Sequence, residues 1–162
     1  PESKALAYTS LVRPDLEYAA AAWDTHIKRD IAELEKVQRR AARFAKSDYR
    51  RTTSVTELLS NLKWDLLSLS RKKTRLAMLF KATHGLSAVP LDGLCRPVRN
   101  TRSSKSTTFV RLPSRTDSYK NSFFPRTVAD WNSLSDFARS RSSVDAFRDA
   151  LSSDLAQPPG CC

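Results

Sequence analysis

Apolar residues recur at helical spacing through the first half of the chain. Between positions 27 and 44 they fall at steps of three and four, which predicts a long helix with one buried face. These residues are Ile27, Ile31, Leu34, Val37, Ala41 and Phe44. Similar but shorter patterns predict helices over 3–12, from Pro14 to Trp23 and after an N-cap at Ser54. A further helix is predicted from Leu66 to a C-cap at His84-Gly85.

The pattern changes after residue 86. Proline, serine and threonine become frequent up to residue 121, which favours loops, and the stretch 107–112 alternates as a strand would. Ser122 is then a candidate N-cap for a helix with Phe124, Val128 and Trp131 on one face, and a last helix is predicted over 143–151.

Together these patterns predict a mainly α protein. We expect a small helical bundle over 1–85, a basic loop-rich arm over 86–121 with at most a short strand pair, and two short C-terminal helices within 122–151. Residues 152–162 are expected to form a frayed tail. The aromatic residues beside apolar neighbours are assigned to packing and not to base stacking; they are Tyr8, Tyr18, Trp23, Trp64 and Trp131.

The net charge of the chain indicates what kind of partner it binds. The chain has 28 Lys and Arg against 17 Asp and Glu, a net charge of +11, so a polyanion and above all nucleic acid is the first partner to consider. On the helix over 27–44, one side carries a cationic ridge formed by Arg29, Lys36, Arg39, Arg40, Arg43 and Lys46. A second group, Arg71, Lys72, Lys73 and Arg75, is predicted to point outward from the next long helix. The plainer interpretation is that both groups are solvated helix faces.

The sequence contains no recognisable catalytic motif. There is no adjacent Asp pair, no GxSxG motif and no glycine-rich phosphate loop. Two sets of acidic residues are interpreted as solvated helix faces, namely Asp30, Glu33 and Glu35, and Asp145 and Asp149. His26, His84 and the cysteines Cys95, Cys161 and Cys162 lack a metal-ligand spacing. We therefore expect no catalytic residue, no metal site and no cofactor within this chain.

The sequence also bears on the cellular environment. No segment approaches the roughly 20 apolar residues that span a bilayer, and the start has no signal-peptide form. We expect no membrane partner and an intracellular location, nuclear and cytoplasmic, without secretion. Because the chain begins at Pro1 in a helical pattern, we also expect it to be a piece of a longer protein.

Three blocks resemble one family, in the same order. They are AYTSLVRPDLEYA at 7–19, LEKVQRRAARF at 34–44 and SYKNSFFPRTVADWNSL at 118–134. Together they are similar to the region that follows the polymerase core in non-LTR (LINE-type, jockey-like) retrotransposon reverse transcriptases. The Cys/His cluster that some related elements carry after this region is missing, and the ending QPPGCC at 157–162 matches nothing in the family.

The resemblance implies a thumb and C-terminal region that grips the template-primer duplex. Its implied partners are RNA–DNA hybrid or other nucleic acid and an upstream polymerase palm of the same polypeptide, which would hold the divalent metal outside this chain. Binding to a duplex of any sequence requires Lys and Arg side chains that contact backbone phosphates. The predicted nucleic-acid-binding residues are Lys36, Arg39, Arg40, Arg43, Arg71, Lys72, Arg75 and Arg126. Arg126 matches the family motif, but an ion pair with Asp130 is an equal alternative.

Two other interpretations of the chain remain open. It could be a free-standing basic adaptor, or a domesticated module without a polymerase, whose amphipathic helices contact other proteins. It could also be a remnant that does not fold alone. Circular dichroism of the isolated chain would separate the last case from the others, because an unfolded remnant would show little helix.

Overall fold

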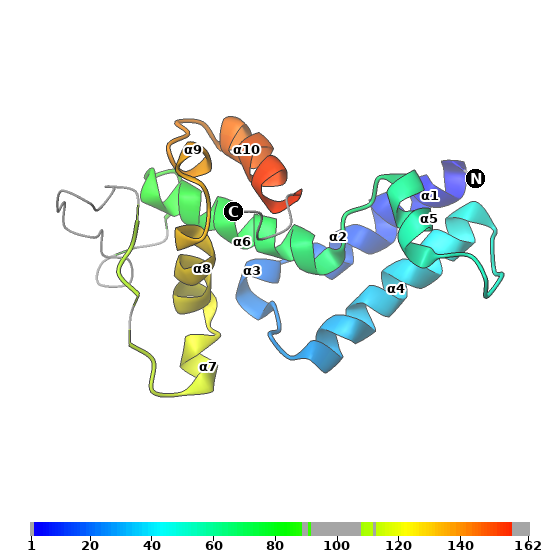
Figure 1. The fold of residues 1–162 in the computed structure, drawn as a ribbon, viewed down its shortest axis with the longest axis horizontal. Coiled ribbons are helices and arrows are strands. Elements are labelled where there is room, and N and C mark those ends of the chain that lie inside the picture. Colours follow the sequence, from blue (N-terminus) through cyan, green and yellow to red (C-terminus); the bar gives the residue numbers. More distant parts are fainter. Residues whose placement is uncertain (1, 89–90, 92–107, 112, 157–162) are drawn as a thin grey trace, which may run out of the picture. The chain divides into compact units, whose positions relative to one another are not determined.

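The structure is a computed structural model that describes residues 2–88, 91, 108–111 and 113–156. Helices dominate this part of the chain, which confirms the predicted mainly α class (Figure 1). The helices of residues 2–83 are α1 (Glu2–Ala7), the π-helical turn η1 (Tyr8–Val12), α2 (Arg13–Glu17), α3 (Ala20–Trp23), α4 (Lys28–Lys46), α5 (Val55–Leu62) and α6 (Leu67–Thr83). The later ones are α7 (Asp117–Lys120), α8 (Phe123–Asn132), α9 (Asp136–Arg139) and α10 (Val144–Ala156).

The chain divides into two compact units. Unit 1 is Pro1–Lys72 and unit 2 is Lys73–Cys162, so that the division falls inside α6. These compact units are not the domains predicted from the sequence, whose boundaries at residues 85, 121 and 151 stay predictions. Most of the predicted basic arm, residues 92–107, lies outside the described residues.

Unit 1 begins with a helical run that does not stop before Pro14. The first helix was predicted over 3–12, but the next residue, Arg13, also keeps α dihedrals, with φ −63° and ψ −40°. Its N–H donates to the carbonyl of Tyr8, five residues back, in the widened turn η1. Proline lacks an N–H and crowds the carbonyl four residues before it, so a widened turn at this point lets the run continue into α2.

The helix expected from Pro14 to Trp23 is interrupted. Tyr18 leaves the helix, Ala19 takes a left-handed conformation with φ 49°, and α3 starts at Ala20. A left-handed alanine costs about 1–2 kcal/mol, so tertiary contacts must offset the break. One such contact is made by Asp24, which directly follows α3 and binds the buried Arg71. The helix propensity of the alanine run is overridden here.

The buried face of α4 differs from the predicted one. Its most buried residues are Glu35, Gln38, Ala42 and Ala45. Ile27 and Phe44 are about half exposed, and the other predicted core residues of this helix are only partly buried. The observed face lies about one residue further along, a rotation of about 100°. The unit 1 core forms around this face and includes Tyr8, Leu58, Leu59 and Trp64.

The two polar residues of that face have a structural task. Gln38 accepts a hydrogen bond from Leu67 N at 3.2 Å and donates one to Asp65 O at 2.8 Å. Glu35 accepts one from Ser68 N at 2.8 Å. The first backbone N–H groups of a helix have no partner within it. Glu35 and Gln38 therefore cap the start of α6, and the expectation that Glu35 lies on a solvated face is wrong.

Tyr8 carries a pH-dependent prediction. Its ring lies in the core, with its centroid 4.6 Å from that of Trp64, and burial raises its pKa to about 12, with further increases from Glu17 and Glu35 and a decrease from Arg13. An unfolded tyrosine titrates near pH 10. Between these values the folded state binds more protons, so the free energy of unfolding should fall as pH rises from about 10 to about 12.

Urea unfolding at about pH 9 and about pH 11.5 would measure this loss. The matched control is Tyr8→Phe, which keeps the ring and should lose less stability between the same two pH values. An equal loss in both proteins would show that Tyr8 is not the group responsible.

Unit 2 has its own core around the C-terminal half of α6. Helices α8, α9 and α10 lie around this half, as Figure 1 shows. The core residues include Leu76, Leu79, Phe80, Trp131, Leu134, Phe147 and Leu151. Helix α6 ends as predicted, because Gly85 takes φ 68° and Leu86 N donates to Lys81 O at 2.8 Å.

Two expectations for the second half are revised. Residues 108–111, the described part of 107–112, form no full strand but only an isolated β-bridge at Phe109. Asn132 also accepts from Phe109 N at 3.1 Å and donates to Phe109 O at 2.7 Å. The side chain thus imitates a strand partner and holds this extended segment against the end of α8. The last helix continues to Ala156, so 152–156 is not a frayed tail, and 157–162 lies outside the described residues.

Candidate nucleic-acid interface

The cations of α4 form the strongest candidate surface. Lys36, Arg39 and Arg40 are exposed, as are Arg29 and Lys46. Lys36 pairs with Glu33 at 2.6 Å, one turn earlier on the same helix. In the described part of the chain, no carboxylate lies within ion-pair distance of Arg39 or Arg40. We call these five residues the α4 ridge; from Arg29 to Lys46 it extends about 25 Å at the helical rise per residue.

Arg43, the remaining predicted residue of this helix, has a structural role. It is half-buried and donates to the backbone carbonyls of Arg50 at 2.7 Å and Thr53 at 3.5 Å. Asp48 anchors the same loop through hydrogen bonds from Arg50 and Thr53, and the bond from Arg50 holds the pKa of this carboxyl well below its usual range. Arg43 therefore fixes the loop between α4 and α5, and it is left out of the α4 ridge.

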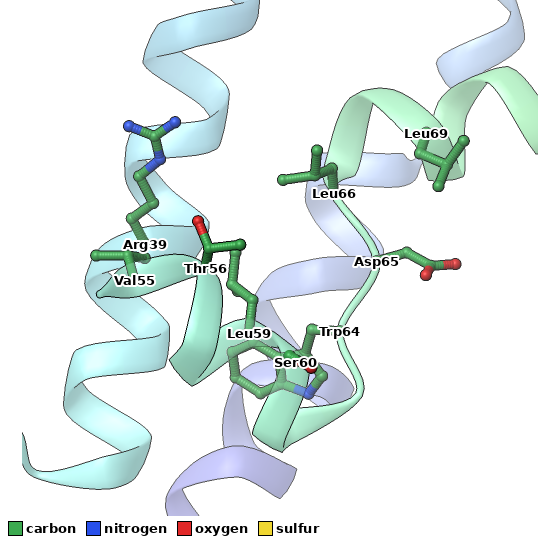
Figure 2. Close-up of a pocket in the computed structure, with 9 residues that line it drawn as sticks. All are labelled: Arg39, Val55, Thr56, Leu59, Ser60, Trp64, Asp65, Leu66 and Leu69. Carbon is green, nitrogen blue, oxygen red and sulfur yellow. The ribbon is translucent and has the colours of Figure 1, made fainter. Parts of the chain in front are cut away.

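A hollow of about 550 Å³ lies beside Arg39 in unit 1. Figure 2 shows Arg39 on one side of it and Leu66 and Leu69 on another. Leu59 and Trp64 also line it, together with Asp65, so the lining is largely apolar. The volume is in the range of about 300–1,000 Å³ typical of small-molecule pockets, but Arg39 and Asp65 are the only charged residues among its described lining.

Arg71 is the clearest correction to the predicted site. The sequence placed it on the outer side of its helix, whereas its side chain is 0% exposed and donates to Asp24, itself 4% exposed, at 2.8 Å. Its guanidinium also lies 5.7 Å from the ring centroid of Trp23. A guanidinium enclosed in this way cannot reach a phosphate without unfolding of unit 1, so Arg71 is a structural residue.

Arg75 is corrected for the same reason. Its side chain is 3% exposed and donates to Asp130 at 3.0 Å within unit 2. Lys72, the third predicted residue of α6, is partly buried and also interacts with the protein. A signal for both arginines exists in the sequence: Leu67, Arg71, Arg75 and Leu79 follow at steps of four, so they share one face of the helix.

Arg126 is half-buried in the first half of α8. It lines a hollow of unit 2 together with Asp130, Arg111 and Lys120. Asp130 accepts a hydrogen bond from Arg75. The pairing of Arg126 with Asp130 that the sequence suggests stays a prediction. The structure brings Arg126 together with Arg111 and Lys120, two cations of the predicted basic arm over 86–121.

The expectation that this chain holds no metal ion stays a prediction. Among the residues that the structure describes, no group of three or more His, Cys, Asp or Glu side chains could hold a metal ion. Asp145 and Asp149 are exposed, in agreement with their interpretation as a solvated face. The three cysteines lie outside the described residues.

The aromatic residues divide into two groups. Tyr8, Trp64 and Trp131 are buried, which confirms their assignment to packing. Tyr18 is 79% exposed and therefore does not pack in a core. Trp23 is partly exposed, and its indole donates to the carbonyl of Tyr18 at 2.5 Å.

None of the described helices combines the length and the apolar composition needed to cross a membrane. Comparison of the chain with protein-family profiles, curated proteins and solved structures finds no match. The resemblance to LINE-type reverse transcriptases therefore stays a prediction from the sequence.

Proposed function

We propose that this chain binds nucleic acid through backbone phosphates, with the α4 ridge as its main contact surface. The observation that carries the proposal is the exposure of Arg39 and Arg40 between Lys36 and Lys46, with no described carboxylate opposite the two arginines. Cations on a rigid helix can contact successive phosphates without reading bases. The net charge of +11 adds a long-range attraction to the same partner.

The resemblance to LINE-type elements extends this proposal. It makes the chain a thumb and C-terminal region that grips RNA–DNA hybrid behind a palm, acting inside the cell, in the nucleus and the cytoplasm. In that setting the chain itself is not catalytic, and the divalent metal of polymerisation is held elsewhere in the parent protein. An A-like hybrid, with its wide and shallow minor groove, offers phosphate rows to a helix edge.

The test removes charge from the α4 ridge alone. Arg39→Gln/Arg40→Gln keeps long side chains with good helix propensity, and it leaves the loop contacts of Arg43 intact. We expect affinity for an RNA–DNA hybrid of any sequence to fall roughly tenfold or more, about 1.4 kcal/mol or more. The slope of log affinity against log salt should become shallower by about 0.9 for each phosphate that the variant no longer neutralises.

The matched control is Lys63→Gln/Arg148→Gln, which removes the same charge from exposed positions outside the ridge. This variant should keep nearly all of the affinity and the salt slope. Equal behaviour of the two double variants would mean that net charge alone attracts nucleic acid, and the ridge would lose its role.

A protein-contact function is the second candidate, and one observation favours it. Unit 1 exposes many large apolar side chains, among them Leu6, Leu11, Val12, Tyr18, Ile27 and Phe44. Exposed apolar side chains commonly mark a surface for other proteins where they lie together in one patch. Docking through them would respond weakly to salt, whereas phosphate binding weakens steeply, so the salt titration above separates the two functions.

A further inference from the structure

A small basic hollow in unit 2 is a second candidate site. It lies between the end of α7, one side of α8 and the extended segment that contains Arg111. Three cations line it, Arg111, Lys120 and Arg126, together with the carboxylate of Asp130. We call it the α7–α8 hollow.

Local interactions place these cations. Asn132 holds the backbone of Phe109 through both of its polar atoms, at 3.1 Å and 2.7 Å, and so anchors the extended segment two residues before Arg111. Thr116 caps α7 by accepting from Tyr119 N at 3.3 Å, and Asn121 donates to Asp117 O at 2.8 Å. The hollow is thus built on an anchored strand-like segment and a capped turn of helix.

The carboxylate in the hollow does not cancel its positive charge. Asp130 accepts a hydrogen bond at 3.0 Å from Arg75, whose side chain is 3% exposed. This buried guanidinium adds a fourth cation to the three that line the hollow. A cationic ligand would be repelled by this positive field, and an anion would be attracted.

The volume of the hollow and the kind of donor groups that line it indicate which anion it can bind. The hollow has a volume of about 160 Å³, well below the roughly 300–1,000 Å³ of pockets that enclose drug-sized ligands. The first half of α8 offers few backbone donors at this point, because Pro125 lines the hollow and has no N–H. The charged donors that line the hollow are guanidinium and ammonium groups, which recognise phosphate oxygens through charge-assisted hydrogen bonds.

We infer that the α7–α8 hollow binds one phosphate group, and that on nucleic acid it holds a single backbone phosphate. This inference rests on the proposed function, but it adds a contact in unit 2 that the α4 ridge does not contain. It also gives Arg126 a role together with Arg111 and Lys120, which are not among the binding residues predicted from the sequence.

The experiment uses the full chain and the variant Arg111→Gln/Lys120→Gln. Both side chains are exposed, so the fold should survive, and circular dichroism would verify this. We expect inorganic phosphate to perturb the NMR signals of Asn121 and Ala129 in the wild-type protein and not in the variant. Hybrid affinity should fall roughly tenfold, and the salt slope should become shallower by about 0.9, the effect of one phosphate. The control is again Lys63→Gln/Arg148→Gln, which should change neither measurement.

Ser114→Glu is an independent second variant. It leaves every cation in place and adds a carboxylate at an exposed residue that lines the hollow. It should weaken both phosphate and hybrid binding. If both variants bound inorganic phosphate and hybrid as tightly as the wild-type protein, the inference would be overturned.

The outcomes separate this inference from the proposed function. Loss of hybrid affinity in the α4 ridge variant with none in either hollow variant would overturn the inference and leave the proposed function standing. If the hollow variants lost inorganic phosphate binding but kept the hybrid affinity of the wild-type protein, the inference would also be overturned. The hollow would then bind free phosphate only. A weaker hybrid affinity in both the ridge and the hollow variants would support both.

Discussion

Replacing Arg71 with Met should lower the free energy of unfolding of unit 1 by about 3–5 kcal/mol. The substitution keeps a long side chain but leaves the carboxylate of Asp24, 4% exposed, without the guanidinium that lies 2.8 Å from it. The loss of a guanidinium that is paired with a buried carboxylate is among the costliest point changes in a folded protein. Chemical denaturation monitored by circular dichroism would measure the loss.

Two further variants make the result specific. Arg148→Met removes an exposed arginine that has only a loose ion pair, at 3.8 Å, and it should change stability by less than about 0.5 kcal/mol. Asp24→Asn/Arg71→Met removes both charges, so part of the stability should return. An Arg71→Met protein as stable as the wild type would contradict the buried ion pair and would reopen an outward role for Arg71.

The same variant also tests the corrected interface. Under conditions in which Arg71→Met stays folded, its affinity for RNA–DNA hybrid should equal that of the wild-type protein, since the side chain does not reach the surface. Reduced affinity in a fully folded Arg71→Met protein would return this residue to the binding site.

Replacing Trp131 with Ala should destabilise unit 2 by about 3–5 kcal/mol. The indole is buried, and its ring centroid lies 5.5 Å from that of Phe147, 5.8 Å from that of Phe109 and 6.4 Å from that of Phe80. Truncation removes this aromatic packing and leaves a cavity that a close-packed core closes only in part. Urea unfolding followed by far-ultraviolet circular dichroism is the suitable measurement, because the variant loses the tryptophan of unit 2 and its remaining Trp23 and Trp64 belong to unit 1.

Phe137→Ala is the matched control for Trp131. Phe137 is also an aromatic residue of unit 2, but it is mostly exposed and contacts Arg141 at the surface. Its removal should cost less than about 1 kcal/mol. Similar losses of stability in the two variants would mean that Trp131 is not at the centre of this core.

Much of this arrangement could be predicted from short-range patterns. The extent of α4, the C-cap at Gly85 and the packing role of Trp131 follow from spacing and residue type. The helical spacing of apolar residues can be recognised within one or two turns, and the prediction is strongest in segments that contain many apolar residues. Arg39 and Arg40 are exposed as predicted, because they lie outside both the predicted buried face of α4 and the observed one.

Other features could not be predicted in this way. The apolar face of α4 was predicted about one residue away from the buried one, because Glu35 and Gln38 are turned inward to cap α6. The alanine run was predicted to continue a helix that breaks at Ala19. In each case, a residue distant in sequence supplies the contact that overrides the local preference.

By itself, the sequence determined the helical class, the excess of positive charge and the cationic side of α4, since these depend on composition and on neighbours a few residues apart. Only the tertiary structure decided which arginines are free to meet a phosphate. Arg71 and Arg75 are enclosed because Asp24 and Asp130, 47 and 55 residues away, lie against them in the folded chain. A cation can be buried when a carboxylate compensates the loss of hydration, and the fold is what brings the two charges together.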